Sequence, residues 1–369
     1  MIRPAWAEID LACIRRNVRE IRRGLKPQTQ MMAVVKANGY GHGAAQVAAT
    51  CRDYGVEWIG VAIVEEGIAL RRAGIEGPIL VLGLAPAAQA PLIVANGLTA
   101  TVCTLEGARS LSAAALDLGT IAKVHVKVDT GMGRLGIRPQ AAREFIKTLL
   151  ELPNLEVEGI FTHFSTADAV DRSYFRQQLS KFTGVLAELQ QEGISIPIVH
   201  GANSATVAVA PEAEFDLVRA GISLYGLQPA PDIVQLDLQP ALSLKARVSY
   251  VHRVPAGTGI SYGRRYMTER ETTIATIPVG YADGYSRLLS NRAEVLVRGR
   301  RYRISGTICM DQCMIDVGDD PIEIGDEVVL IGRQGDEVIS ADELAGIMGT
   351  IHYEIVCLIS ERIPRIYLG

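Results

Sequence analysis

Residues 32–43 read MAVVKANGYGHG, a short apolar run that stops at Lys36 and passes into a glycine-rich turn. Runs of this kind recur along the first part of the chain, and segments of helix length separate them. The eight runs are MAVVKA (32–37), WIGVAI (58–63), ILVLGL (79–84), LTATVC (98–103), KVHVKVD (123–129), VEGIFTHF (157–164), IPIVHGA (196–202) and DLVRAGI (216–222). Eight strand and helix units predict a (β/α)8 barrel of the TIM type, whereas six or seven would have suggested an open sheet.

The pattern changes after about residue 240, where β-branched segments alternate with glycine or charged turns. These segments are LKARVSYVHRV (244–254), TTIATIPVG (272–280), AEVLVRGRRYRI (293–304) and DEVVLIG (326–332). They predict a mostly β domain. One helix interrupts it, since Ser340 and Glu343 form a capping-box pattern and Gly349 is a stop signal. We therefore expect a barrel over residues 1–237, whose first few residues are candidates for packing with the β domain, and a β domain over residues 238–369.

Composition excludes several classes of protein. The 369 residues are 48% hydrophobic and 21% charged, with a formal net charge of -4, which does not suggest nucleic acid as a partner. The most apolar stretch, residues 77–98, is broken by prolines, so we expect no membrane span. The N-terminus lacks the pattern of a signal peptide. Scattered cysteines are typical of buried, reduced thiols, and Cys309 and Cys313 lack a nearby histidine, so we expect a cytoplasmic protein with no metal site.

Reactive side chains follow several of the predicted strands. In barrels of this kind catalytic groups lie at the carboxyl ends of the strands. Lys36, Lys127, His163 and Arg219 all occupy such places. A partly desolvated lysine has a lowered pKa and attacks aldehydes, whereas the plainer interpretation of Lys36 is a lysine whose head reaches the barrel rim.

A phosphate site is also indicated after the last two strands. Ser204 offers a hydroxyl group, and the Gly221 and Ile222 segment offers backbone N–H donors. Phosphate sites recur at this place in TIM barrels.

Several longer motifs, in order along the chain, resemble those of the alanine racemases, which pair a pyridoxal-phosphate barrel with a C-terminal β domain. The resemblance covers essentially the whole chain. The motifs are AVVKANGYGHG (33–43), KVDTGMGRLG (127–136), THFSTAD (162–168), GANSAT (201–206), VRAGISLYG (218–226), GISYG (259–263), PVGYADGYSR (278–287), GTICMDQ (306–312) and HYEIVC (352–357).

The resemblance implies that Lys36 binds pyridoxal 5'-phosphate as a Schiff base and also acts as one of two catalytic bases. Tyr262 would be the other. Inverting a carbon through a planar carbanion requires a base on each face. A free tyrosine, with a pKa of about 10, is a feeble base, so its phenolate needs a stabilising neighbour. In the family His163 lies beside this tyrosine and is linked to Arg219.

The remaining implied contacts hold the cofactor and the substrate. The cofactor residues are Lys36, Tyr40, His163, Ser204, Arg219, Gly221, Ile222 and Tyr353. Arg219 would contact the pyridine nitrogen and keep it unprotonated. Arg134 and the backbone N–H of Met310 would bind the substrate carboxylate. Lys127 is carbamylated in some members to orient this arginine, and the sequence leaves that open here.

The expected function is interconversion of L-alanine and D-alanine, supplying D-alanine for cell-wall peptidoglycan, by a homodimer that shares its active sites between chains. A serine or broad-specificity amino-acid racemase is the alternative within the family. A decarboxylase would generally bind the pyridine nitrogen with a carboxylate instead of Arg219. A cofactor-binding protein without catalysis would lack the second domain.

Overall fold

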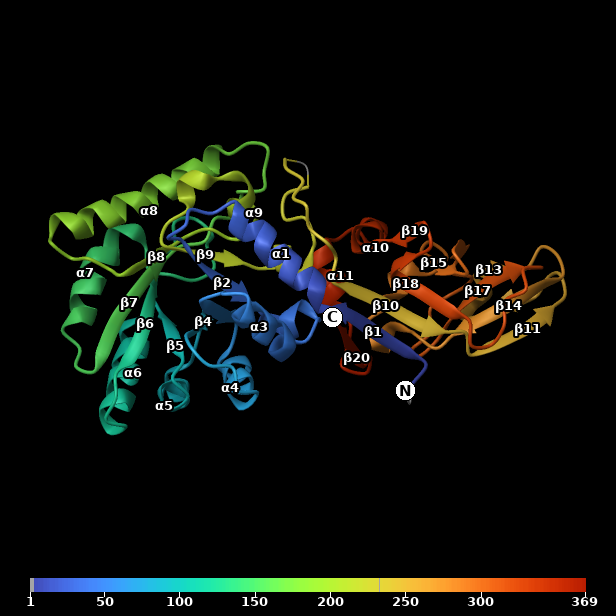
Figure 1. Cartoon of the computed structure of the whole chain (residues 1–369), viewed down its shortest axis with the longest axis horizontal. Coiled ribbons are helices and arrows are strands. Elements are labelled where there is room, and N and C mark those ends of the chain that lie inside the picture. The colour runs from blue at the N-terminus through green and yellow to red at the C-terminus, as the bar shows by residue number, and fades with distance from the viewer. Residues whose placement is uncertain (1–2, 232) are drawn as a thin grey trace. The chain divides into compact units, whose positions relative to one another are not determined.

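The N-terminal barrel contains the eight predicted strands. The structure is a computed structural model that describes residues 3–231 and 233–369. All eight strands run parallel, in the order β8-β7-β6-β5-β4-β3-β2-β9. Their bounds are β2 Gln30–Val34, β3 Trp58–Val61, β4 Ile79–Leu84, β5 Thr99–Val102, β6 Ala122–Lys127, β7 Leu155–Phe161, β8 Ile198–His200 and β9 Leu217–Ala220 (Figure 1). The prediction of a barrel is confirmed.

Two backbone hydrogen bonds close the seam between the first and last strands of this order. The N–H of Asp216 donates to Val199 O and that of Arg219 donates to Ala202 O, both at 3.0 Å. Since these bonds tie β9 to the end of β8, they bring Arg219 beside the segment that precedes Ser204. Barrel closure is thus part of how the candidate site forms.

Helices follow the strands as the amphipathic patterns predict. Asp10 caps the first helix, since its Oδ1 accepts from Ala12 N at 2.8 Å. The helix predicted from Arg172 to Gln191 spans Ser173–Gln191. The helices are α1 Leu11–Arg23, α3 Ala44–Asp53, α4 Val64–Arg72, α5 Ala90–Ala95, α6 Leu105–Asp117, α7 Pro139–Leu150, α8 Ser173–Gln191 and α9 Ser204–Val209.

The C-terminal unit is mostly β, as predicted. Contacts divide the chain into this unit, formed by the N-terminal residues through Ala12, Tyr40–His42 and Pro240–Gly369, and the barrel unit, formed by Cys13–Gly39 and Gly43–Gln239. Its main sheet has the order β16-β15-β18-β10-β1-β20, with β19 paired to β18. These strands are β1 Ala5–Asp10, β10 Leu242–Arg247, β15 Glu294–Val297, β16 Arg300–Arg303, β18 Glu327–Gln334, β19 Glu337–Ile339 and β20 Arg365–Leu368.

Two smaller sheets and two helices complete this unit. The sheets are β11-β14-β17 (Tyr250–Val254, Thr272–Ile277, Cys313–Gly318) and β12-β13 (Gly259–Ile260, Tyr266–Met267). Helix α10 (Ala341–Met348) has the predicted cap, since Ser340 Oγ accepts from Glu343 N at 3.0 Å, and α11 spans His352–Leu358.

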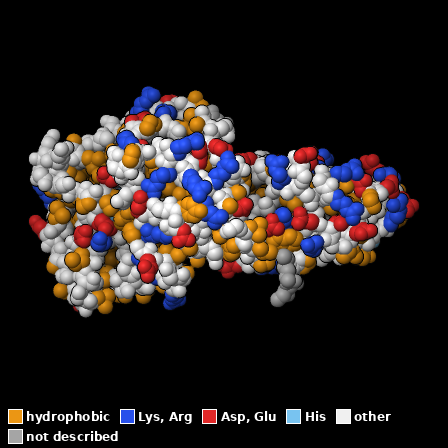
Figure 2. Space-filling model, viewed as in Figure 1, with side chains coloured by type: hydrophobic (Ala, Val, Ile, Leu, Met, Phe, Trp, Pro, Cys, Tyr) orange, Lys and Arg blue, Asp and Glu red, His pale blue; other side chains and the backbone are white. Residues whose placement is uncertain are grey.

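The surface and the cysteines bear on the expected class of protein. Figure 2 shows acidic and basic side chains interspersed over the C-terminal unit on the face in view. None of the described helices is both long enough and apolar enough to cross a membrane. Of the six cysteines only Cys51 and Cys313 are buried, and Cys357 is exposed, so the prediction of buried thiols is wrong for Cys357.

Candidate active site

The segment after Lys36 is a left-handed turn. Within Lys36–Tyr40, labelled α2, Ala37 and Asn38 have φ values of 51° and 52°. Side chains disfavour this conformation by roughly 1–2 kcal/mol per residue, so the surrounding contacts must hold it. Glu66 Oε1 accepts from Ala37 N at 2.6 Å, and Asn38 Oδ1 accepts from Ala44 N at 3.0 Å. The glycine-rich turn after Lys36 is thus held by hydrogen bonds to the side chains of Glu66 and Asn38.

Arg219, on β9, is the centre of a buried hydrogen-bond network. Its side chain donates to Nδ1 of His200 at 2.7 Å and to Nδ1 of His163 at 3.2 Å. Its other hydrogen bonds go to the carbonyl oxygens of Thr162 (2.9 Å) and Gly201 (3.0 Å). The residue is 4% exposed, and none of these acceptors is a carboxylate. A buried guanidinium held by neutral acceptors is unusual and marks a candidate functional group.

Positive charges around Arg219 depress the pKa values of their neighbours. Burial, reinforced by Arg134, lowers the pKa of Arg219 to about 9. Burial also holds the pKa of His163 well below its usual value, as do the charges of Arg219, Lys127, Arg134 and Lys36. His163 is therefore neutral at pH 7. Because Arg219 donates to its Nδ1, its proton lies on Nε2.

Lys127, at the end of β6, is a buried amine of the same cluster. Its Nζ has no hydrogen-bond partner among the described residues and lies 4.8 Å from the ring centroid of Phe161. Burial, followed by the charges of Arg219 and Arg134, lowers its pKa well below the usual value. The lowered pKa increases the neutral fraction of this amine, and the neutral form is the nucleophilic one.

Ser204, the first residue of α9, forms the candidate phosphate site with the turn after β9. Its Oγ accepts from Gly221 N at 2.7 Å and from Ser223 Oγ at 3.0 Å. A hydroxyl oxygen that accepts two hydrogen bonds still has its own proton to donate. Ile222 begins a short turn, Ile222–Tyr225, and is fully buried. The segment can therefore present donors to an anion.

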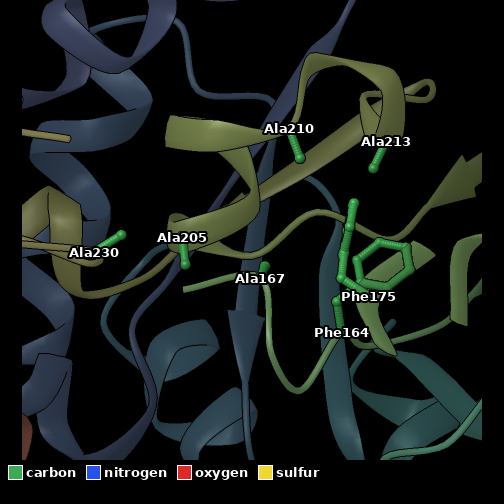
Figure 3. Packing of buried hydrophobic residues seen from close by; sticks show 7 residues of the cluster. All are labelled: Phe164, Ala167, Phe175, Ala205, Ala210, Ala213 and Ala230. Atoms are coloured by element: carbon green, nitrogen blue, oxygen red, sulfur yellow. The ribbon is translucent and has the colours of Figure 1, made fainter. Parts of the chain in front are cut away.

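A buried apolar cluster supports this turn from within the barrel unit. Figure 3 shows the two rings of Phe164 and Phe175 close to alanines of the α9 region. The ring centroids lie 4.9 Å apart at 69°. The cluster contains Phe164, Ala167, Phe175, Ala205, Ala210, Ala213 and Ala230. Since Ala205 directly follows Ser204, the packing fixes the start of α9.

The C-terminal unit carries the other predicted residues. Tyr262 is 72% exposed and Met310 is 53% exposed. The Tyr262 carbonyl accepts from Thr307 Oγ1 at 2.9 Å, and the Met310 carbonyl accepts from Ala282 N at 3.0 Å. Their backbones are thus held while their side chains face outward.

Tyr40 and Tyr353 lie close together within the same unit. Their ring centroids are 6.2 Å apart. Tyr353 also stacks on His352, at 5.0 Å between centroids.

The barrel unit thus brings together Lys36, Lys127, Arg134, His163 and Arg219, with Ser204 beside Gly221. Sequence reasoning missed His200, which holds Arg219, and His125, which holds His200. Both histidines stand in the apolar strand runs quoted above, and a histidine amid such a run is the only signal that could have found them.

Comparison with known proteins gives matches over nearly the whole chain. Residues 9–229 match the family model of the alanine racemase N-terminal domain, and residues 241–367 match that of the C-terminal domain. A curated alanine racemase from Symbiobacterium thermophilum is 51% identical over 370 residues, which cover 100% of this chain and 98% of that protein.

Solved structures agree in fold. An alanine racemase from Clostridium difficile 630 aligns with a TM-score of 0.96 and 40% identity, covering 100% of this chain and 96% of the other. A histidine racemase from Leuconostoc mesenteroides subsp. sake aligns with a TM-score of 0.93 and 30% identity, covering 100% and 99%. The same fold therefore also occurs in a racemase named for a larger substrate.

Proposed function

This chain belongs to the alanine racemase family, and from that premise we infer that it is an isomerase that interconverts L-alanine and D-alanine. The family implies pyridoxal 5'-phosphate as cofactor. The observation that carries the proposal is Arg219, a buried guanidinium without a carboxylate partner, in one cluster with Lys36 and His163.

The residues present fit this cofactor. Lys36 would bind its aldehyde carbon, and Arg219 would donate to its ring nitrogen. The phosphate would be held by Ser204 Oγ, the backbone at Gly221 and Ile222, and the hydroxyl groups of Tyr40 and Tyr353. The Ser204 hydroxyl supports this assignment, because both of its hydrogen bonds within the turn are accepted ones.

Two bases then exchange the α-proton of the substrate. When bound, pyridoxal phosphate withdraws electrons from the α-carbon and so acidifies its C–H bond. Lys36 Nζ removes or returns the proton on one face, and Tyr262 Oη does so on the other. His163, with its proton on Nε2, would donate to the phenolate oxygen of Tyr262. Arg134 and the N–H of Met310 would hold the substrate carboxylate.

We further propose a homodimer in which Tyr262 and Met310 serve the barrel of a second copy. The exposure of both side chains supports this arrangement. A cytoplasmic location and a supply of D-alanine for peptidoglycan complete the proposal.

One assay tests the function directly. The purified protein, loaded with pyridoxal phosphate, is incubated in deuterated water with L-alanine, L-serine or L-histidine in separate tubes. We expect D-alanine with deuterium at the α-carbon. Inert alanine beside an active serine or histidine would instead identify a racemase of another specificity. The histidine racemase of the same fold makes this comparison necessary.

A further inference from the structure

Two buried histidines that the mechanism above does not use connect Arg219 to an acidic residue on β7. Arg219 donates to His200 Nδ1 at 2.7 Å, and His200 Nε2 lies 2.8 Å from His125 Nδ1. His125 Nε2 lies 3.6 Å from Glu158 Oε2, which is longer than a good hydrogen bond, and has no other partner among the described residues. Both histidine side chains are fully buried. We call these four residues the Arg219–Glu158 chain.

The guanidinium fixes the direction of every bond in this chain. Because Arg219 has donors and no acceptor, His200 Nδ1 must accept, and a neutral His200 then has its proton on Nε2. That N–H donates to His125 Nδ1, which leaves the proton of His125 on Nε2, directed at Glu158. Burial lowers the pKa of both histidines, which keeps them neutral.

Packing holds both rings in place. A Cβ added at Gly159 would lie 2.6 Å from ring atoms of His125, so this ring occupies space that only a glycine leaves free. Phe161 stacks on His200, with centroids 4.6 Å apart and planes 2° apart. The rings therefore cannot turn over without disturbing the barrel interior.

A strand irregularity places Glu158 at the end of the Arg219–Glu158 chain. Val124 pairs with Val157 and His125 with Gly159, so Glu158 is an extra residue on β7. Such irregularities redirect a side chain. Glu158 Oε1 accepts from Lys123 Nζ at 2.6 Å, while Oε2 faces His125 and also accepts from Thr99 Oγ1 at 3.4 Å. Burial would raise the pKa of this carboxyl group, but the contacts with His125 and Lys123 outweigh it and lower the pKa.

We propose that Glu158 is a positioning residue for Arg219 and acts on it through His125 and His200. The inference rests on the proposed function, in which Arg219 faces the pyridine nitrogen. Without the carboxylate, the buried Nε2–H of His125 loses its acceptor, and Nδ1 of the same ring becomes a weaker acceptor for His200. His200 Nδ1 then accepts less strongly from Arg219, although both tautomers stay as the guanidinium fixes them. The loss of charge at Glu158 thus reaches the cofactor site.

The test reads the tautomers directly. Histidine labelled with ¹⁵N gives a spectrum of only six side chains in the holoenzyme, and His125→Gln and His200→Gln assign two of them. We expect both to carry their proton on Nε2 in the wild type. Glu158→Leu should move the ¹⁵N resonances of both rings while their protons stay on Nε2, and Glu158→Gln should move them less, because its amide oxygen still accepts. Wild-type His125 protonated on Nδ1, or unchanged resonances in Glu158→Leu, would overturn the proposal.

Glu156→Gln is the matched control. Glu156 lies on the same strand and contacts the same Lys123, at 3.9 Å, but pairs with no histidine. The Glu156→Gln variant should leave the ¹⁵N resonances of His125 and His200, and kcat, unchanged. Glu158→Leu should lower kcat about 3- to 30-fold with KM nearly constant, and Glu158→Gln should stay close to wild type. Equal losses of kcat in Glu158→Leu and Glu156→Gln would show that Glu158 acts only as a surface charge.

The two proposals fail separately. Alanine that is not racemised by the wild type would defeat the proposed function, while the tautomers would still report on the chain. Unchanged ¹⁵N resonances in Glu158→Leu would defeat the present inference even in an active racemase. If Glu158→Leu does not fold, the wild-type tautomers and the kcat of Glu158→Gln remain decisive.

Discussion

Arg219 and His163 are joined by a hydrogen bond of 3.2 Å from the guanidinium to Nδ1 of the imidazole. Because an arginine only donates, this contact fixes His163 as an acceptor on one side and a donor on the other. A neutral histidine with its donor directed outward suits a phenolate partner. The relationship therefore connects the residue proposed to face the pyridine ring with the residue proposed to assist Tyr262.

His163→Phe should lower kcat by about 100-fold, because general acid–base catalysis typically contributes that much or more. The rising limb of the pH profile should also move to higher pH, since a phenolate that loses a donor forms less readily. Steady-state rates between pH 6 and 10 check both effects. A rising limb at its wild-type position would show that His163 does not stabilise the base.

Lys36→Ala and Tyr262→Phe should each be inactive, and mixing them should restore activity. In a dimer with shared sites, a mixed pair has one complete site of its two, so isolated mixed dimers should have about half of wild-type activity. The measurement is racemisation after co-expression of the two variants with different tags and isolation of mixed dimers. Mixed dimers without activity would place both bases in one chain.

Lys127 should react with carbon dioxide, because burial and the neighbouring arginines lower its pKa and so favour the neutral amine that attacks carbon dioxide. Protein equilibrated with ¹³C-bicarbonate should give a carbamate resonance that Lys127→Ala lacks. Lys123, on the same strand, is the control, since the hydrogen bond to Glu158 raises its pKa and keeps it charged. A resonance lost in Lys123→Ala and kept in Lys127→Ala would contradict the assignment.

Phe175→Ala should destabilise the protein by about 3–5 kcal/mol, the usual cost of removing a buried phenyl ring. Phe175 is fully buried against Phe164, in the cluster beside Ser204. Denaturant unfolding measures the change, and cofactor retention should fall as well. Gln177→Ala, exposed on the same helix, should change stability by less than about 0.5 kcal/mol.

Stability should decline as pH falls from 7.5 to 5.5, a window in which ordinary carboxyl groups remain ionised. Burial lowers the pKa values of His125, His163 and His200 in the folded chain. As the pH falls, the histidines of the unfolded chain therefore take up protons first, at about pH 6.5. The unfolded chain thus gains stability relative to the folded chain. Denaturant midpoints should show the decline, and His200→Gln should flatten it. An equally steep decline in this variant would assign the pH dependence of stability to other groups.

Local sequence patterns were sufficient to predict the strands and helices themselves. The alternation of eight apolar runs with helical segments predicted the barrel, because strand and helix periodicities depend on near neighbours. Ser340 likewise predicted a helix start that the structure confirms. The site residues were predicted by motif and remain proposals.

The sequence by itself determined the strands, the order of the units and the family to which the chain belongs. Only the tertiary structure decided that His125 and His200, 75 residues apart, meet at 2.8 Å and connect Arg219 to Glu158. Alternation along a strand predicts which side chains point inward, but not which of them face each other across a closed barrel. Those partners depend on strand register and on the extra residue at Glu158, and both are set by packing between strands.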